Sequence, residues 1–167
     1  MMITFCFDKL GVVVEDIYFV DPDPYPGQEG PERGVRVELR MLDPQPQLGS
    51  VYSSRKIVLD TAIWRVDVLE SVAAGPGSRD RVHYHPDTAD NEPGDRVFDP
   101  ALSADPAGWL AERLAEPEKI LEGKLGDLAP YAGDIASLRT ESADIVATVS
   151  GLLERVRAGE LAQAPVG

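Results

Sequence analysis

The sequence predicts a single α+β domain over residues 1–167, in which an antiparallel sheet of about six strands packs against C-terminal helices. The hydrophobic pattern changes once along the chain: residues 1–99 are mainly β with Pro- and Gly-rich loops, and residues 105–158 are mainly helical. The connections between the predicted strands are short, whereas parallel strands need long crossovers. A chain of 167 residues is also the size of one domain with one core.

Alternation of polar and apolar residues identifies the predicted strands. It is clearest in residues 34–41, where the apolar set alternates with Arg36, Glu38 and Arg40. The other predicted strands cover residues 3–7, 12–20, 50–60, 61–71, 81–85 and 96–98. Four prolines between residues 21 and 34 predict a long loop, because proline cannot donate a hydrogen bond to a sheet.

The helical half begins at Asp105, which we expect to cap a helix that has Pro106 at its first position. Pro117 ends or restarts that helix, and Asp134 is expected to cap the longest one. This last helix carries an apolar seam at helical spacing, formed by Ile135, Leu138, Ile145, Val149, Leu152 and Val156. The seam either packs on the protein's own sheet or pairs with a second copy in a homodimer.

Composition narrows the function classes. The chain has 16 Lys+Arg against 29 Asp+Glu and a formal net charge of −13, which argues against nucleic acid as a partner. No apolar stretch approaches the ~20 residues that cross a bilayer, and no secretory signal is evident, so we expect no membrane partner. Cys6 is the one cysteine, which fits the reducing cytoplasm. Abundant Ala, Gly, Arg, Asp and Pro suit a bacterial-type protein.

The two histidines of the chain, His83 and His85, are separated by one residue in His83-Tyr84-His85. On a strand, side chains two residues apart lie on the same face, so both imidazoles can reach one ion. Asp90 and Glu92 follow in a polar loop and are the predicted carboxylate ligands. Two histidines and a carboxylate suit one divalent transition metal: Zn, Fe, Ni or Mn. Arg65 and Asp67, polar residues on the same sheet face, would then line a pocket.

The spacing of Gly77, His83, His85 and Asp90 resembles the first motif of the cupin family, in which a glycine precedes His-x-His and a glutamate follows. The resemblance covers about 14 residues and implies a metal held by the two histidines and the carboxylate. Asp90 stands where the motif has glutamate, and the chain has no third histidine for the second motif. We therefore do not assign the chain to that family.

Three functional hypotheses follow. The first is a binding protein that takes a divalent metal or a small-molecule ligand through His83 and His85. The second is a non-enzymatic acidic interaction protein, which binds a basic protein partner or forms a homodimer through the helix over residues 135–156. The third is a metal-dependent enzyme on the same histidine pair, which needs a reactive pocket in addition to the metal. The histidines could also be structural residues that bind no ligand.

Overall fold

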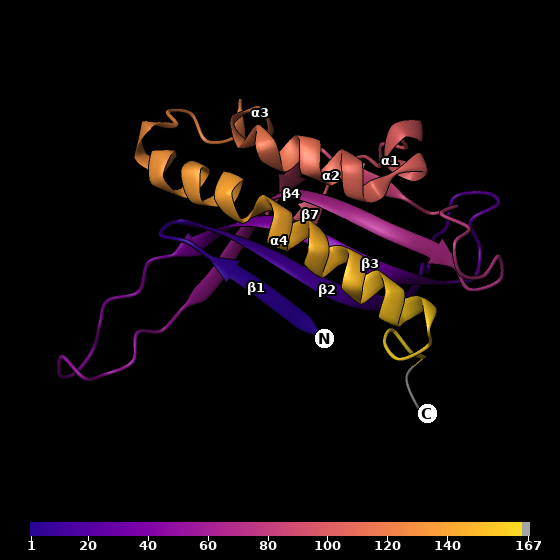
Figure 1. Ribbon diagram of the computed structural model, residues 1–167, viewed down its shortest axis with the longest axis horizontal. Helices are drawn as coiled ribbons and strands as arrows, with labels where there is room; N and C mark the ends of the chain where they lie inside the picture. The colour runs from indigo at the N-terminus through magenta and orange to yellow at the C-terminus, as the bar shows by residue number, and fades with distance from the viewer. Residues whose placement is uncertain (165–167) are drawn as a thin grey trace.

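The computed structural model describes residues 1–164 and has the predicted α+β architecture (Figure 1). Residues 165–167, the end of the predicted domain, lie outside the described part of the chain. The strands are β1 (Met2–Cys6), β2 (Leu10–Val20), β3 (Pro31–Asp43), β4 (Val58–Ser71), β5 (His83–His85), β6 (Thr88–Ala89) and β7 (Glu92–Pro93). The helices are α1 (Pro100–Ala104), α2 (Pro106–Ala115), α3 (Pro117–Leu121), the 3-10 turn η1 (Ala129–Tyr131) and α4 (Ala132–Arg157).

The main sheet has five strands in the order β1-β2-β3-β4-β5, and every neighbouring pair is antiparallel. Short connections place successive strands side by side, which is why sheet order follows chain order. Strands β6 and β7 form a separate two-stranded hairpin. The strand predicted over residues 50–60 is wrong for most of its length: residues 44–57 form a long loop, and residues 58–60 are the start of β4. The strand predicted over residues 96–98 is reduced to a single bridge between Val97 and Tyr84.

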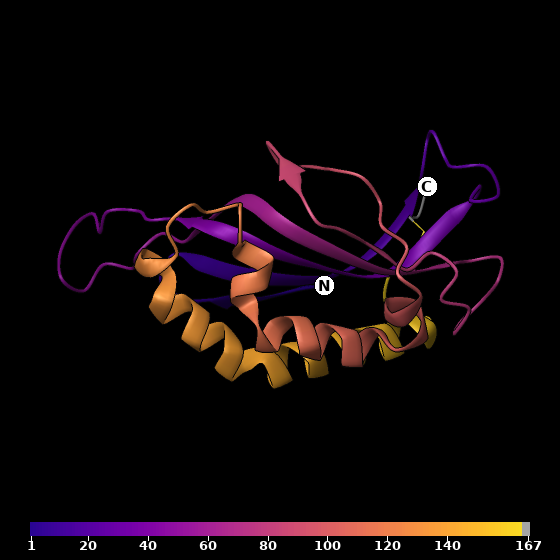
Figure 2. The ribbon, with the colours of Figure 1, turned by 90° about the horizontal axis from the view of Figure 1, so that it is seen from above.

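Helices α2 and α4 cover one face of the sheet, and the β6–β7 hairpin stands on the opposite side (Figure 2). The apolar set of the alternating strands faces the helices and is buried, including Val12, Val14, Val35, Val37, Leu39, Val66 and Val68. The seam of α4 is buried in the same cluster, as the first of its two interpretations requires. In a single chain the seam therefore offers no free apolar face to a partner helix.

Proline and aspartate begin two of the helices, as the sequence predicts at Asp105. The Asp105 carboxylate accepts a hydrogen bond from the amide of Gly108, and Pro106 follows it at the start of α2. Asp99 caps α1 in the same way through the amide of Ala101. Among residues 1–164, no helix is long and apolar enough to cross a membrane.

Asp134 has a different role from the predicted helix cap. It lies in the first turn of α4, and its side chain makes no cap hydrogen bond there. Its Oδ1 atom instead accepts hydrogen bonds from the backbone amides of Asp8, Lys9 and Leu10, at 3.0, 2.8 and 2.9 Å. These amides belong to the turn between β1 and β2 and to the first residue of β2, which are far from Asp134 in the sequence. The buried carboxylate thus fastens the start of α4 to the sheet.

We predict that Asp134→Ala lowers the free energy of unfolding by about 3 kcal/mol or more, because three backbone amides lose a charged acceptor in a largely buried site. Urea unfolding followed by circular dichroism measures the change. Asp144→Ala is the matched control, since Asp144 is an exposed residue of the same helix. Equal stability of the two variants would contradict the anchoring role of Asp134.

Candidate metal centre

The polar face of the sheet, opposite the helices, carries the two histidines. Antiparallel pairing sets Asp67 of β4 directly across from His83 of β5, and Arg65 across from His85. Tyr84 lies between the histidines and packs on Trp109 of α2, with 5.1 Å between ring centroids. Because side chains alternate along a strand, this contact turns His83 and His85 toward the other face.

An aromatic stack fixes the position of that short edge strand. The rings of Trp64 and Trp109 are parallel within 4°, with centroids 6.0 Å apart, so they join β4 to α2. Two further hydrogen bonds link Tyr84 and Val97 through their backbones, at 3.1 and 2.9 Å. A strand of three residues is therefore held from the helix side and along its outer edge.

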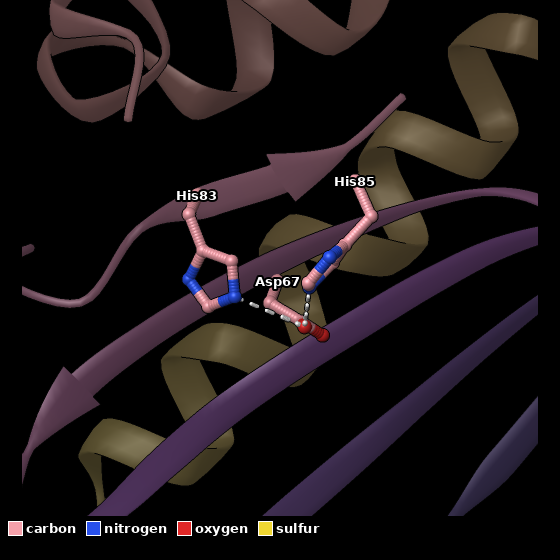
Figure 3. A group of neighbouring side chains, drawn as sticks. All are labelled: Asp67, His83 and His85. Carbon is pink, nitrogen blue, oxygen red and sulfur yellow. Dashed lines mark ion pairs between the residues drawn. The ribbon is translucent and has the colours of Figure 1, made fainter. Parts of the chain in front are cut away.

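The side chains of His83 and His85 converge on one carboxylate oxygen (Figure 3). Their Nε2 atoms lie 3.4 and 3.5 Å from Oδ2 of Asp67. All three residues are buried, at 3%, 2% and 0% exposure. One ligand atom from each residue lies within 4.8 Å of the others, so this group could hold a metal ion.

The other nitrogen of each ring is already engaged. Nδ1 of His83 lies 2.8 Å from the carbonyl oxygen of Arg81, and Nδ1 of His85 lies 2.8 Å from that of Gly94. A carbonyl only accepts hydrogen bonds, so each Nδ1 must carry the proton. In the neutral rings, each Nε2 then presents a lone pair toward Asp67. Ligating histidines in metalloproteins are commonly held this way, with the second nitrogen donating to a carbonyl.

Two arginines hold the Asp67 carboxylate. Nε of Arg36 donates to Oδ1 at 2.8 Å, while Nε and Nη2 of Arg65 lie 2.8 and 2.7 Å from Oδ2. Burial alone would raise the pKa of the Asp67 carboxyl. The nearby imidazoles of His83 and His85 and the charges of the two arginines outweigh burial, and they hold that pKa well below its usual range. The carboxylate is therefore ionised at neutral pH.

This arrangement disfavours nucleophile activation by the histidines. A general base needs a ring nitrogen directed at the proton that it removes, but one nitrogen of each ring faces a carbonyl and the other faces Asp67. Cys6 also lies on β1, at the edge of the sheet opposite β5, so it does not pair with either imidazole. Binding a cation between the three side chains is the chemistry that the geometry supports.

The predicted carboxylate ligands lie elsewhere. Asp90 and Glu92 are exposed in the β6–β7 hairpin, and the structure does not bring them into the group formed by Asp67, His83 and His85. Asp90 and Asn91 have φ angles of 51° and 68°, as in a tight two-residue hairpin turn. The Asn91 side chain accepts hydrogen bonds from Arg40 and the amide of Ala62, which fastens the hairpin to the sheet.

Sequence reasoning placed Asp67 on the correct face but assigned it to a pocket wall, not to the ligand set. The signal that identifies it is strand register. Once β4 and β5 are paired, Asp67 lies directly across from His83. Alternation alone gives the face of each residue and leaves this register open.

The low pKa of Asp67 predicts how stability depends on pH. In metal-free protein, the ionised carboxylate stabilises the fold above its unfolded pKa of about 3.9, and this contribution is lost as pH falls through the lower folded-state pKa. Asp67→Asn, measured in chelator, should therefore be less stable by about 3 kcal/mol at pH 7, with the difference narrowing only below about pH 4. Urea unfolding between pH 3 and 7 measures it. A difference that disappears by pH 6 would contradict this assignment.

Comparison with known proteins adds no assignment, because no family model, curated protein or solved structure matches the chain. The likeness of Gly77, His83, His85 and Asp90 to a cupin motif thus stays a resemblance of spacing. In the structure Gly77 lies in the loop between β4 and β5, and Asp90 lies in the hairpin turn.

Proposed function

We propose that the protein binds a divalent metal ion, with Zn²⁺ as the best fit, through Asp67, His83 and His85. The observation that supports this most directly is the meeting of two Nε2 lone pairs at one anionic oxygen, with both Nδ1 protons committed to carbonyls. Three acceptors that face one another in a buried place repel, and either a proton or a metal cation between them relieves that repulsion. Nε2 of His85 accordingly has no hydrogen-bond partner among the described residues.

The distances favour a metal ion over a shared proton. A charge-assisted N–H···O⁻ bond is about 2.7–2.9 Å long. The observed separations of 3.4 and 3.5 Å are longer, and they match the edge of a coordination tetrahedron, which is about 3.4 Å for bonds of about 2.1 Å. An octahedral ion at the same bond length has edges of about 3.0 Å. Tetrahedral geometry with two imidazoles and one carboxylate is typical of zinc, and it leaves a fourth position open.

The test is elemental analysis of purified, tag-free protein after exposure to Zn²⁺ and removal of excess metal. We expect about one Zn²⁺ per chain in the wild type and loss of the metal in the His83→Ala, His85→Ala double variant, because a single carboxylate does not retain zinc. The matched control is Asp90→Asn, Glu92→Gln, which changes the two carboxylates of the exposed hairpin and should keep the metal.

Circular dichroism must show that each variant is folded. Metal retained by the histidine variant, or wild-type protein that stays free of metal, would contradict the proposal and leave the histidines as structural residues. Loss of metal in the hairpin variant alone would instead support the ligands that the sequence predicted.

A second candidate is the non-enzymatic interaction protein, which the loop over residues 44–57 favours. The loop projects beyond the end of the sheet (Figures 1 and 2) and contains Arg55 and Lys56 but no acidic residue. Four large apolar side chains are exposed on it: Leu48, Val51, Tyr52 and Ile57, at 77%, 83%, 94% and 66%. An apolar loop with a charge of +2 on a chain of net charge −13 is suited to contact the acidic surface of a second copy.

If the loop mediates a homodimer, light scattering should give twice the monomer mass for the wild type and the monomer mass for Val51→Ser, Tyr52→Ser. Added salt should weaken the association, since screening reduces the attraction between opposite charges. The control is Thr148→Ser on α4, a mild change in a half-buried side chain distant in sequence from the loop. A wild type that is monomeric at high concentration and low salt would exclude this candidate.

A further inference from the structure

A polar cleft of about 620 Å³ opens beside the metal centre, on the side of the sheet opposite the helices. The loop between β2 and β3, over residues 21–26, and the segment over residues 93–96 line it from above the sheet. Arg65 and His85 line it from the sheet itself. His85 is thus shared by the cleft and the centre, and its buried Nε2 atom has no hydrogen-bond partner among residues 1–164. A ligand in the cleft would approach the fourth coordination position of the ion along the His85 side chain.

Two arginines give the cleft its recognition chemistry. Arg65 uses Nε and Nη2 on Asp67, which leaves its Nη1 amine for another acceptor. Nη2 of Arg96 donates to Asp21 at 2.7 Å, and its guanidinium lies 5.2 Å from the centre of the Tyr25 ring. This stacking and ion pair hold Arg96 in one place at the cleft wall. A planar guanidinium with free N–H groups binds a carboxylate well.

The charge balance of this face calls for an anion once a metal is bound. The neighbouring carboxylates of Glu15, Glu38 and Asp67 are matched by the guanidinium groups of Arg36, Arg40 and Arg65. A divalent ion would add two positive charges to this neutral set, and an anionic ligand would reduce that excess. Exposed Asp23 and Asp95 also line the cleft, so a ligand with high negative charge is disfavoured.

We propose that the cleft binds a small carboxylic acid whose carboxylate occupies the open metal position and contacts Arg65 and Arg96. This rests on the proposed metal-binding function. The cleft is large enough for a few carbon atoms beyond the carboxylate. The cleft suits a dicarboxylate better than a monocarboxylate. One carboxylate would then contact the metal ion and Arg65, and the other would contact Arg96.

Succinate is a suitable probe, and Co²⁺ replaces Zn²⁺ so that ligand entry changes the visible absorption spectrum. We expect succinate to change the spectrum of the Co²⁺-loaded protein saturably. Arg96→Gln should weaken the apparent affinity about tenfold or more, as loss of a charged hydrogen-bond partner does, while bound Co²⁺ stays unchanged. Arg139→Gln is the matched control: Arg139 also pairs with one carboxylate, that of Glu118, but it lies on α4.

The outcomes separate the two proposals. Bound Co²⁺ with no response to succinate, or equal affinity in wild type and Arg96→Gln, would overturn the carboxylate site and leave metal binding intact. A response to inorganic phosphate but not to succinate would overturn the assignment to carboxylic acids. Protein that takes up no metal would overturn both proposals, and elemental analysis of the same samples identifies that case.

Discussion

A fully buried carboxylate constrains the whole polar face of the sheet. Asp67 has no exposed surface, and an ionised group in that position must be compensated by neighbouring donors and cations. Arg36 and Arg65 supply that compensation from the adjacent strand and from two residues along its own strand. Because both oxygens are held by guanidinium groups, the carboxylate has a fixed orientation before any metal binds. His83 and His85 therefore face a carboxylate whose position is already fixed by the two arginines.

The alternation of side chains along β4 and β5 places core residues on one face of the sheet and the centre on the other. Val66 and Tyr84 are paired across β4 and β5 and face the helices, so their neighbours face the polar side. Packing of Tyr84 on Trp109 therefore determines where the imidazoles point. The helical layer thus influences the centre without contributing a ligand, and changes in the aromatic stack should move the histidines together.

Local patterns were sufficient for the fold class and for two of the three residues of the centre, His83 and His85. Periodicity identified the antiparallel sheet, the helical C-terminal half and the facing of His83 and His85. The third member of the group depends on the pairing of strands that are separated by a long loop, and local sequence does not fix that register. Asp90 and Glu92 were attractive because they follow the histidines closely, yet a tight hairpin turn directs the chain away. Residues that are close in sequence therefore need not be close in space when a turn separates them.

The sheet that carries the centre is packed against the helices without any contribution from a metal. This determines how much a bound metal would add to the stability of the fold. In small zinc domains the metal supplies the energy of folding, so the apo form is unfolded. Here one hydrophobic cluster spans the sheet and the helices, and Asp134 fastens α4 without any contribution from the centre. Metal binding should then add stability only by mass action, about 4 kcal/mol at a thousandfold excess over Kd. If a metal binds, a chain that is folded without it is suited to reversible binding, because neither the fold nor the positions of Asp67, His83 and His85 have to be rebuilt each time.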